Sequence, residues 1–228
     1  MDTDFLSRLK KLQVKINQAA KKADRNPNGV KILAISKGQD PDAIKTLFNL
    51  GQMRFGENYL QEALQKKNKL KDLDIEWHFV GAIQSNKTRE IAENFSFIHS
   101  INRIKIASKL NAHCDPKKER LNILIQVKDD QSKKNGVTLE ESYEFINSIE
   151  KFDNLKLRGL MYFPDIGKSE QDSLSDYSKV AGLLTAIKNG DTLSMGTSDD
   201  YPLAILSGAT LVRIGTELFG SRKKSIKY

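Results

Sequence analysis

The sequence predicts one α/β domain, a closed (β/α)₈ barrel of the TIM type with an extra helix at its N-terminus. Short apolar runs alternate with amphipathic segments of helical period along most of the chain, which is typical of a parallel sheet whose strands are joined by helices. Eight such pairs suit a closed barrel better than an open sheet, which usually has fewer strands. Barrels of this kind need about 250 residues. We therefore expect the 228-residue chain to form a single domain, residues 1–228.

The predicted elements follow one another in a regular order. The extra helix covers residues 5–23, where six apolar side chains mostly suit one face: Phe5, Leu6, Leu9, Leu12, Val14 and Ile16. The eight strands are expected at residues 30–36, 53–56, 75–81, 95–101, 121–128, 155–161, 192–196 and 209–215. The helices that follow them are expected at residues 41–51, 58–70, 86–94, 102–114, 138–152, 173–190, 199–208 and 216–220. Thr138 and Glu141 have the spacing of a capping box.

The composition indicates a globular protein of a reducing compartment. Hydrophobic residues make up 39% and charged residues 29% of the sequence, a balance that is too apolar for a disordered chain. Cys114 is the only cysteine, which leaves no disulfide framework and no thiolate zinc site. The sequence has no signal-peptide pattern and no apolar run long enough to span a membrane. We expect a soluble, cytoplasmic protein without membrane partners.

The net charge of +8 is compatible with an anionic partner, but its distribution favours solvated surfaces. The basic residues are scattered through KKADR, KKNKLK, DPKKER and the C-terminal SRKKSIKY. Aromatic side chains, which stack on bases in nucleic-acid sites, do not interleave with these runs. We expect no nucleic-acid partner, and a basic binding patch stays open as the alternative.

Two loops near the C-terminus predict an anion site. In barrels of this type a phosphate site is often formed by the loops after strands 7 and 8. Here these loops carry Ser198, whose hydroxyl can donate a hydrogen bond, and Gly215 and Thr216, whose backbone N–H groups can approach an anion. The alternative is that Ser198 caps a helix and Gly215 serves only a turn. The presence of both loops at the expected positions favours the phosphate site.

Lys37 follows the first predicted strand in the stretch AISKGQD. Strand alternation places it on the same face as Leu33 and Ile35. If that face is the barrel interior, the amine lies at the mouth of a partly dry cavity, where desolvation lowers the pKa of a lysine and favours attack on an aldehyde. The alternative is an ordinary surface lysine at a strand end. An anion site across the mouth favours a phosphorylated aldehyde as the ligand.

Several motifs in order resemble one family over about nine-tenths of the chain. They include ILAISKGQDPDAIKTLFNLGQMRFGENY, WHFVGAIQSNKTR, NILIQVKDDQSKKNGV, LRGLM and LSMGTSDDYPLAILSGATLVRIGTELFG. The sequence resembles the YggS/PROSC family of pyridoxal phosphate homeostasis proteins. This resemblance implies the barrel domain of alanine racemase, known as fold type III among proteins that bind pyridoxal 5′-phosphate. It also implies that the cofactor is held as an internal aldimine.

The resemblance implies roles for seven residues of this chain. Lys37 in AISKG would be the Schiff-base lysine, and Asn58 in FGENY would line the cofactor ring near its hydroxyl. Arg213 in VRIGT would face the pyridine nitrogen. The remaining four would line the pocket or bind phosphate: Met195, Ser198, Gly215 and Thr216.

Arg213 at the pyridine nitrogen has a chemical consequence. An arginine stays protonated at neutral pH, so it donates a hydrogen bond to the ring nitrogen without protonating it. The cofactor is then a weaker electron sink than one paired with a carboxylate. Related racemases supply a second base, a tyrosine, from another domain, and this chain has no room for that domain. These points favour a carrier of the cofactor over an enzyme.

Some positions depart from the family pattern. Gly38 stands where threonine is usual, Thr197 stands where methionine is common, and the proline-rich loop after strand 6 is short. These changes affect loop shape and ring contacts more than cofactor binding. His78 and His99 lie in or after strands 3 and 4, where satisfied core histidines are favoured over ligand contacts. No histidine has a carboxylate at a spacing suited to metal binding.

Three hypotheses follow for the function. The favoured one is a non-catalytic protein that binds pyridoxal 5′-phosphate, contributes to its homeostasis and delivers it to apoenzymes that need it. The first alternative is an amino-acid racemase that uses the same cofactor, and the second is a nucleic-acid or regulatory module. The resemblance and the lack of an exposed apolar stripe favour a monomer.

Overall fold

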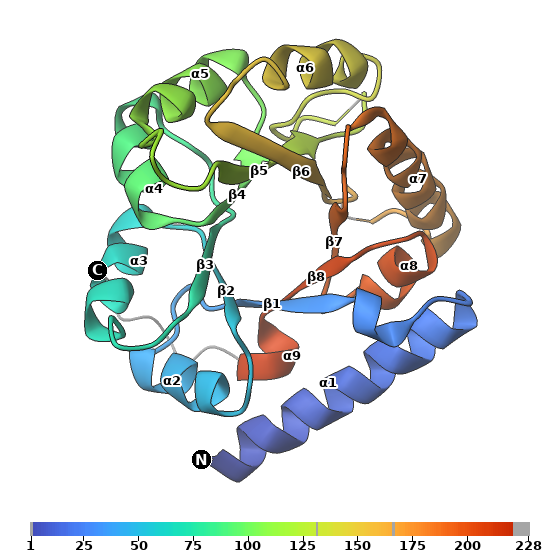
Figure 1. Ribbon diagram of the computed structural model, residues 1–228. Coiled ribbons are helices and arrows are strands. Elements are labelled where there is room, and N and C mark those ends of the chain that lie inside the picture. Colours follow the sequence, from blue (N-terminus) through green and yellow to red (C-terminus); the bar gives the residue numbers. More distant parts are fainter. Residues whose placement is uncertain (1, 131, 166, 221–228) are drawn as a thin grey trace.

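Eight parallel strands form a closed barrel in chain order, from β1 to β8, with helices around it (Figure 1). The computed structural model describes residues 2–130, 132–165 and 167–220. The strands are β1 (Lys31–Ile35), β2 (Arg54–Glu57), β3 (Glu76–Phe79), β4 (Phe97–Ile101), β5 (Leu121–Val127), β6 (Leu155–Tyr162), β7 (Thr192–Thr197) and β8 (Leu211–Ile214). The predicted fold class and the predicted order of strands are confirmed.

Helices follow the strands on the outside of the barrel (Figure 1). They are α2 (Pro41–Asn49), α3 (Leu60–Lys69), α4 (Thr88–Asn94), α5 (Ile104–His113), α6 (Ser142–Ile149), α7 (Glu170–Leu183), α8 (Tyr201–Leu206) and α9 (Thr216–Phe219). Short 3₁₀ turns lie at Pro27–Gly29, Ser85–Lys87 and Leu184–Ala186. The extra helix α1 (Asp2–Lys22) packs beside α8 and α9, as Figure 1 shows.

The side chains of the strands divide into two buried sets because alternate residues point to opposite faces of the sheet. One set packs between the strands and the helices and forms the main core. The other set fills the barrel and contains two small apolar clusters, which are built around Leu33, Val80, Leu211 and around Phe97, Leu124, Met161. Polar side chains are also buried among this second set, including His78, His99, Ser194 and Arg213. The barrel interior is therefore partly polar.

Two local expectations need correction. The regular part of α6 begins at Ser142, three residues after the position expected from the capping box, although Thr138 and Glu141 do exchange the expected hydrogen bonds. Residues 139–141 first form a turn, in which the N–H of Ser142 donates to the backbone oxygen of Leu139, and the regular helix follows that turn. In α1, Leu12 and Ile16 are buried but Val14 is 54% exposed, because two residues turn a helix by about 200°.

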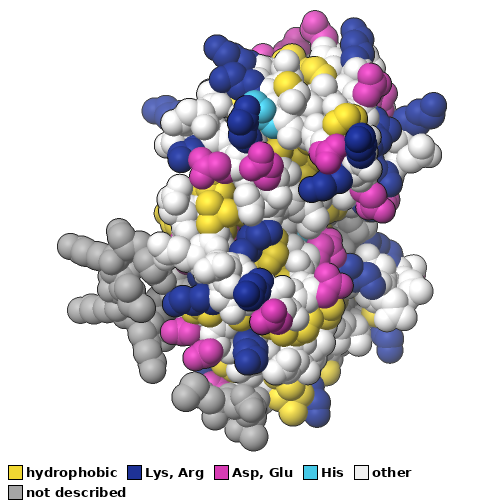
Figure 2. All heavy atoms as spheres, turned by 60° about the vertical axis from the view of Figure 1, so that its left-hand side comes forward, with side chains coloured by type: hydrophobic (Ala, Val, Ile, Leu, Met, Phe, Trp, Pro, Cys, Tyr) yellow, Lys and Arg dark blue, Asp and Glu magenta, His cyan; other side chains and the backbone are white. Residues whose placement is uncertain are grey.

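Surface charge is mixed where it can be seen. In Figure 2, Lys and Arg side chains alternate with Asp and Glu side chains across the visible face. The C-terminal basic run SRKKSIKY, residues 221–228, lies outside the described residues. Within the described ranges, no helix has both the length and the apolar character to cross a bilayer, and no group of three His, Cys, Asp or Glu side chains is arranged to hold a metal ion.

Candidate functional site at the carboxyl end of the barrel

Lys37 lies in the turn that follows β1 and is half-buried. Its neighbours along the chain differ in environment: Ser36 is fully buried, and Gly38 is exposed and has a φ of +72°. The preceding inward-facing residues, Leu33 and Ile35, belong to an apolar cluster inside the barrel. The alternation therefore runs as predicted, and the turn that carries Lys37 lies at the end of the barrel where the carboxyl ends of the strands meet.

A buried ionic network holds the turn on both sides of Lys37. The Lys66 ammonium on α3 donates hydrogen bonds to the backbone oxygen of Ser36 at 2.6 Å, to Glu57 at 2.8 Å and to Glu62 at 2.6 Å. The Ser36 hydroxyl donates to Glu57 at 2.6 Å, and the backbone N–H of Gly38 donates to Glu62. Residues 36 and 38 are thus bound to α3 and β2, which restricts where residue 37 can lie.

The charges of this network do not balance. Two carboxylates face one ammonium, and the side chains of all three residues are almost completely buried. Burial raises the pKa of Glu57 above its ordinary value, while Lys66 opposes that shift. One Glu57 oxygen, Oε2, is buried without a hydrogen-bond partner. Such groups are costly to bury unless they are held in place, so the network fixes the geometry of the turn at some cost in stability.

Asn58 follows β2 at the same end of the barrel and is half-buried. Its Oδ1 atom is buried and has no hydrogen-bond partner. Its backbone lies against Gly81, where an added Cβ would come within 1.9 Å of the Asn58 carbonyl oxygen. Only glycine permits this approach, so the loop after β3 fixes the position of Asn58. The backbone oxygen of Gly81 in turn accepts a 2.5 Å hydrogen bond from Ser100.

Arg213 is buried at the inner face of β8. Its Nη1 donates to the backbone oxygen and hydroxyl of Ser194, the latter at 2.8 Å, and its Nη2 donates to the backbone oxygen of Tyr162 at 2.8 Å. The guanidinium lies 3.8 Å from the ring centre of Phe163, a cation–π contact. Burial lowers the pKa of Arg213 to about 10, so the side chain stays charged at neutral pH. Its Nε is buried without a partner.

The loops after β7 and β8 meet as predicted. The backbone N–H of Gly215 lies 3.3 Å from the Ser198 hydroxyl and donates to it. Thr216 is exposed and begins the four-residue helix α9. Ser198 does not cap α8, for which no side-chain cap is formed. The structure therefore brings Ser198, Gly215 and Thr216 together next to the end of β1, which pairs directly with β8.

The turn after β7 is held by hydrogen bonds to Asp200 and by a close backbone contact at Gly196. Asp200 accepts hydrogen bonds from the Thr197 N–H at 2.7 Å, from the Thr197 hydroxyl at 2.9 Å and from the Tyr177 hydroxyl at 2.6 Å. Gly196 has a φ of +84°, and a Cβ there would lie 2.6 Å from the Cα of Tyr201. These contacts place Ser198 without using its side chain.

Met195 does not join this group. It is fully buried in the core between the barrel and the helices. Its neighbour Ser194 points into the barrel and bonds to Arg213, so alternation turns Met195 away. The pattern LSMG could have shown this, because strand alternation permits only one of these two neighbours to face inward.

The Lys66 network was not expected from the sequence. The available signal was a pair of charged residues, Glu62 and Lys66, four residues apart on the helical face that also carries Ala63 and Leu70, which are buried. Charged residues on an apolar helix face are rarely buried unless they are paired. Glu57 had no comparable signal, because a short strand end does not reveal which side is covered by a helix.

The comparisons with known proteins identify the family of this chain. The family model "Alanine racemase, N-terminal domain" matches residues 8–223. A pyridoxal phosphate homeostasis protein of Pseudomonas aeruginosa is 42% identical over 93% of this chain and 93% of its own length. Another from Escherichia coli K12 is 39% identical over 98% of this chain and 99% of its own length. The chain belongs to the pyridoxal phosphate homeostasis protein family.

Solved structures of similar proteins support the family and the fold. PipY of Synechococcus elongatus, solved with PLP bound, is 30% identical to this family member, with a TM-score of 0.82 over 95% of this chain and all of PipY. Alanine racemase from Corynebacterium glutamicum is 15% identical, with a TM-score of 0.64, and this chain covers 63% of it. That second likeness shows a shared fold alone.

Proposed function

We propose that this protein binds pyridoxal 5′-phosphate at the carboxyl end of the barrel and contributes to its homeostasis without turning over a substrate. The observation that carries the proposal is a pair of buried polar atoms without partners, one on each side of β1, the strand that precedes Lys37. Arg213 Nε and Asn58 Oδ1 are both buried without partners. Lys37 follows β1, the strand between theirs, and Ser198 and Gly215 lie beside it.

These residues fit the chemical groups of the cofactor. When bound, the cofactor supplies an aldehyde that condenses with a primary amine, forming a C=N bond and releasing water. Lys37 provides the amine. Arg213 provides a donor, Nε, for the pyridine nitrogen. The Ser198 hydroxyl and the backbone N–H groups of Gly215 and Thr216 can turn to the phosphate, since the Gly215–Ser198 hydrogen bond is long at 3.3 Å.

Two features support a role without turnover. Burial lowers the pKa of Arg213 only to about 10, so the guanidinium stays protonated at neutral pH, and a protonated arginine donates a hydrogen bond to the ring nitrogen without giving it a full proton. In addition, β1 to β8 and their helices account for the described chain, so the second domain of a racemase has no counterpart among the described residues. We propose on this basis a monomeric, single-domain, cytoplasmic carrier that passes the cofactor to apoenzymes.

The first test is the absorbance of the purified protein after incubation with pyridoxal 5′-phosphate. We expect a visible band from the lysine-bound cofactor, and we expect Lys37→Ala to abolish it. Lys45→Ala, an exposed lysine on α2, is the matched control and retains the band. A band that survives in Lys37→Ala would place the cofactor elsewhere.

The racemase alternative is tested on the same sample. After addition of L- or D-alanine in deuterated water, proton NMR reports exchange at the α-carbon. The carrier hypothesis expects no exchange above that of free cofactor at equal concentration. Exchange that is faster than the free cofactor and is lost in Lys37→Ala would establish an enzyme instead.

A further inference from the structure

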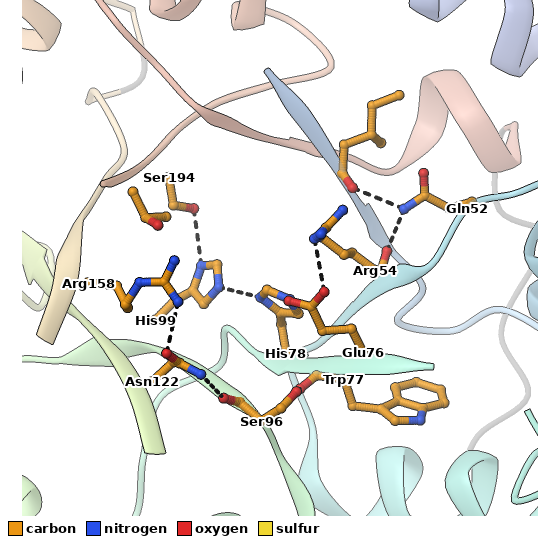
Figure 3. Close-up of polar contacts among 12 residues, drawn as sticks. Gln52, Arg54, Glu76, Trp77, His78, Ser96, His99, Asn122, Arg158 and Ser194 are labelled. Atoms are coloured by element: carbon orange, nitrogen blue, oxygen red, sulfur yellow. Dashed lines mark hydrogen bonds and ion pairs between the residues drawn. The ribbon is translucent and has the colours of Figure 1, made fainter. Parts of the chain in front are cut away.

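The barrel interior contains a continuous line of hydrogen bonds from its amino end to Arg213. Figure 3 shows Glu76, His78, His99 and Ser194 in sequence across the barrel. The Glu76 carboxylate lies 2.9 Å from His78 Nε2, and His78 Nδ1 lies 2.8 Å from His99 Nε2. His99 Nδ1 lies 3.1 Å from the Ser194 hydroxyl, which accepts from Arg213 at 2.8 Å.

The two ends of this line fix the direction of every hydrogen bond in it. Arg213 can only donate, and an ionised Glu76 can only accept. Hydrogen bonding to His78 lowers the pKa of Glu76, so the carboxylate is ionised at neutral pH. Ser194, with its one hydrogen, then donates to His99. Each imidazole therefore carries its hydrogen on Nε2 and accepts through Nδ1.

Packing holds the two rings in these orientations. Phe97 stacks on His78 with ring centres 4.9 Å apart and an angle of 9° between the planes. The same Phe97 meets His99 at 5.2 Å and 61°. Burial lowers the pKa of both histidines, so both rings are neutral at pH 7. Neither imidazole can flip by 180° and reverse the direction of its hydrogen bonds without losing these ring contacts.

The far end of the line opens to solvent. Glu76 and His78 line a cavity of about 370 Å³ at the amino end of the barrel, together with Arg54 and Arg158. Glu76 is 36% exposed on its side chain and also pairs with Arg54 at 3.0 Å. The line thus joins a water-exposed carboxylate to a buried guanidinium at the opposite end of the fold.

Stability alone does not account for this line. The interiors of such barrels are normally filled by branched aliphatic side chains, which need no hydrogen-bond partners. Burying two imidazoles and a hydroxyl costs free energy even when each is bonded, and an apolar filling of equal volume is often as stable. What the arrangement provides is a Ser194 hydroxyl whose oxygen is oriented to accept from Arg213 Nη1. The Nε of Arg213 is then the donor that has no partner.

We propose that Glu76, His78, His99 and Ser194 are a polarised relay that orients Arg213 toward the ring nitrogen of the bound cofactor and strengthens that contact. These four are positioning residues, because they act through Arg213 and do not touch the cofactor. The relay rests on the proposed function for its ligand, but its direction is a property of the protein alone.

The direction is tested without cofactor. Two-dimensional ¹H–¹⁵N correlation spectra of protein labelled with ¹⁵N-histidine distinguish the two neutral tautomers. We expect His78 and His99 both to carry hydrogen on Nε2, with assignment by His99→Phe. A hydrogen on Nδ1 of either ring would overturn the relay.

The coupling to the site is tested with the loaded protein. We expect Glu76→Gln, which removes the charge at the far end, to shift the maximum of the visible band and to weaken cofactor affinity about threefold. His99→Phe, which cuts the line while keeping an aromatic ring, should weaken affinity about tenfold. Glu90→Gln is the matched control: Glu90 is 39% exposed and pairs with Lys87 at 2.9 Å, but it lies on α4 away from the line.

The outcomes separate this inference from the proposed function. A wild-type protein without a visible band overturns the proposed function and the ligand role of the relay together. If Glu76→Gln has the same band maximum and the same cofactor affinity as the wild type, the relay alone is overturned. Glu76→Gln is suited to this test because, unlike His99→Phe, it leaves the core intact. A shift of equal size in Glu90→Gln would also overturn it, because the effect would then be one of net charge.

Discussion

At the scale of single residues, the site depends on glycines, whose lack of a side chain lets neighbouring backbone segments approach closely. Gly81 lets the loop after β3 lie directly against the Asn58 backbone, and Gly196 lets the turn after β7 lie against Tyr201. At both positions a Cβ would overlap backbone atoms, which cannot move aside as a flexible side chain can. Two residues of the proposed cofactor site, Asn58 and Ser198, are therefore positioned with the help of neighbours that carry no functional group.

Gly81→Ala should destabilise the protein and disturb Asn58. The new Cβ would lie 1.9 Å from the Asn58 oxygen, so the two loops must separate, at a cost of about 3 kcal/mol. Urea unfolding followed by circular dichroism measures this change. Gly182→Ala on α7 is the control, because a Cβ there meets nothing within 4 Å and should stabilise the helix by about 0.5–1 kcal/mol. Equal midpoints for the two variants would contradict the overlap.

At the scale of elements, α3 acts as a support for the turn after β1. Lys66 and Glu62 project from one face of α3, and together they bind the backbone on both sides of Lys37. Hydrogen bonds to charged groups are stronger than those between neutral groups. The helix therefore does more than cover the barrel, since it fixes the loop that carries the proposed Schiff-base lysine.

Lys66→Met tests this support. Methionine fills a similar volume but leaves Glu57 and Glu62 buried without a cation, so we expect a loss of about 3–5 kcal/mol in the free energy of unfolding. We also expect weaker cofactor binding under conditions in which the variant stays folded, because residues 36 and 38 lose their restraint. Denaturant titration and absorbance titration measure the two effects.

Lys69→Met, on the exposed part of the same helix, is the control for Lys66→Met. Surface changes of this kind usually alter stability by less than about 0.5 kcal/mol. A Lys66→Met variant with wild-type affinity for the cofactor would show that the network serves stability only.

The elements also show what the sequence could reveal. The change of hydrophobic period between 2 and 3.6 residues was enough to predict all eight strands and the helices after them. The start of α6 was missed because the capping box closes a turn at residues 139–141, and the regular helix begins only after that turn, at Ser142. A capping box marks the first turn of a helix and does not fix how soon the regular helix follows.

The candidate site was predictable in its chain positions and less so in its contacts. The turns that carry Ser198, Gly215 and Lys37 lie at the same end of the barrel, because the carboxyl ends of parallel strands share one edge. Met195 was predicted to line the pocket, but strand alternation points its side chain outward into the main core. The His78–His99 contact depends on which residues of β3 and β4 lie at the same height, and the sequence does not fix that register.

At the scale of the whole molecule, the buried histidines make stability depend on pH. Burial lowers the pKa of His78 and His99 below the ordinary value of 6.5. Just below pH 6.5 the two histidines bind protons in the unfolded chain but stay neutral in the folded barrel. The stabilisation is therefore present above pH 6.5 and is lost as the pH falls toward the folded pKa values, at up to about 1.4 kcal/mol per pH unit for each histidine.

Glu57 makes a pH-dependent contribution of its own, so the test uses a difference. Glu57 has a raised pKa and contributes with the opposite sign, since its stabilisation is lost as the pH rises. Glu57 is present in both the wild type and His99→Phe, so its contribution to stability cancels when the two proteins are compared at each pH. At pH 8 we expect His99→Phe to be less stable by about 2 kcal/mol, because two buried hydrogen bonds are lost.

Below pH 6.5 the difference in free energy of unfolding between wild type and His99→Phe should become smaller. Only the wild type loses stability from keeping a neutral His99 in its folded state. Urea unfolding at half-unit intervals from pH 8 to pH 5 measures the gap. Leu124→Ala, another fully buried residue of the barrel interior, is the control: it removes apolar volume and no titrating group, so its deficit should stay constant across the series. A constant gap for His99→Phe as well would show that His99 binds a proton in the folded barrel as readily as in the unfolded chain, and the line from Glu76 to Arg213 would then carry a charge at its centre below pH 6.5.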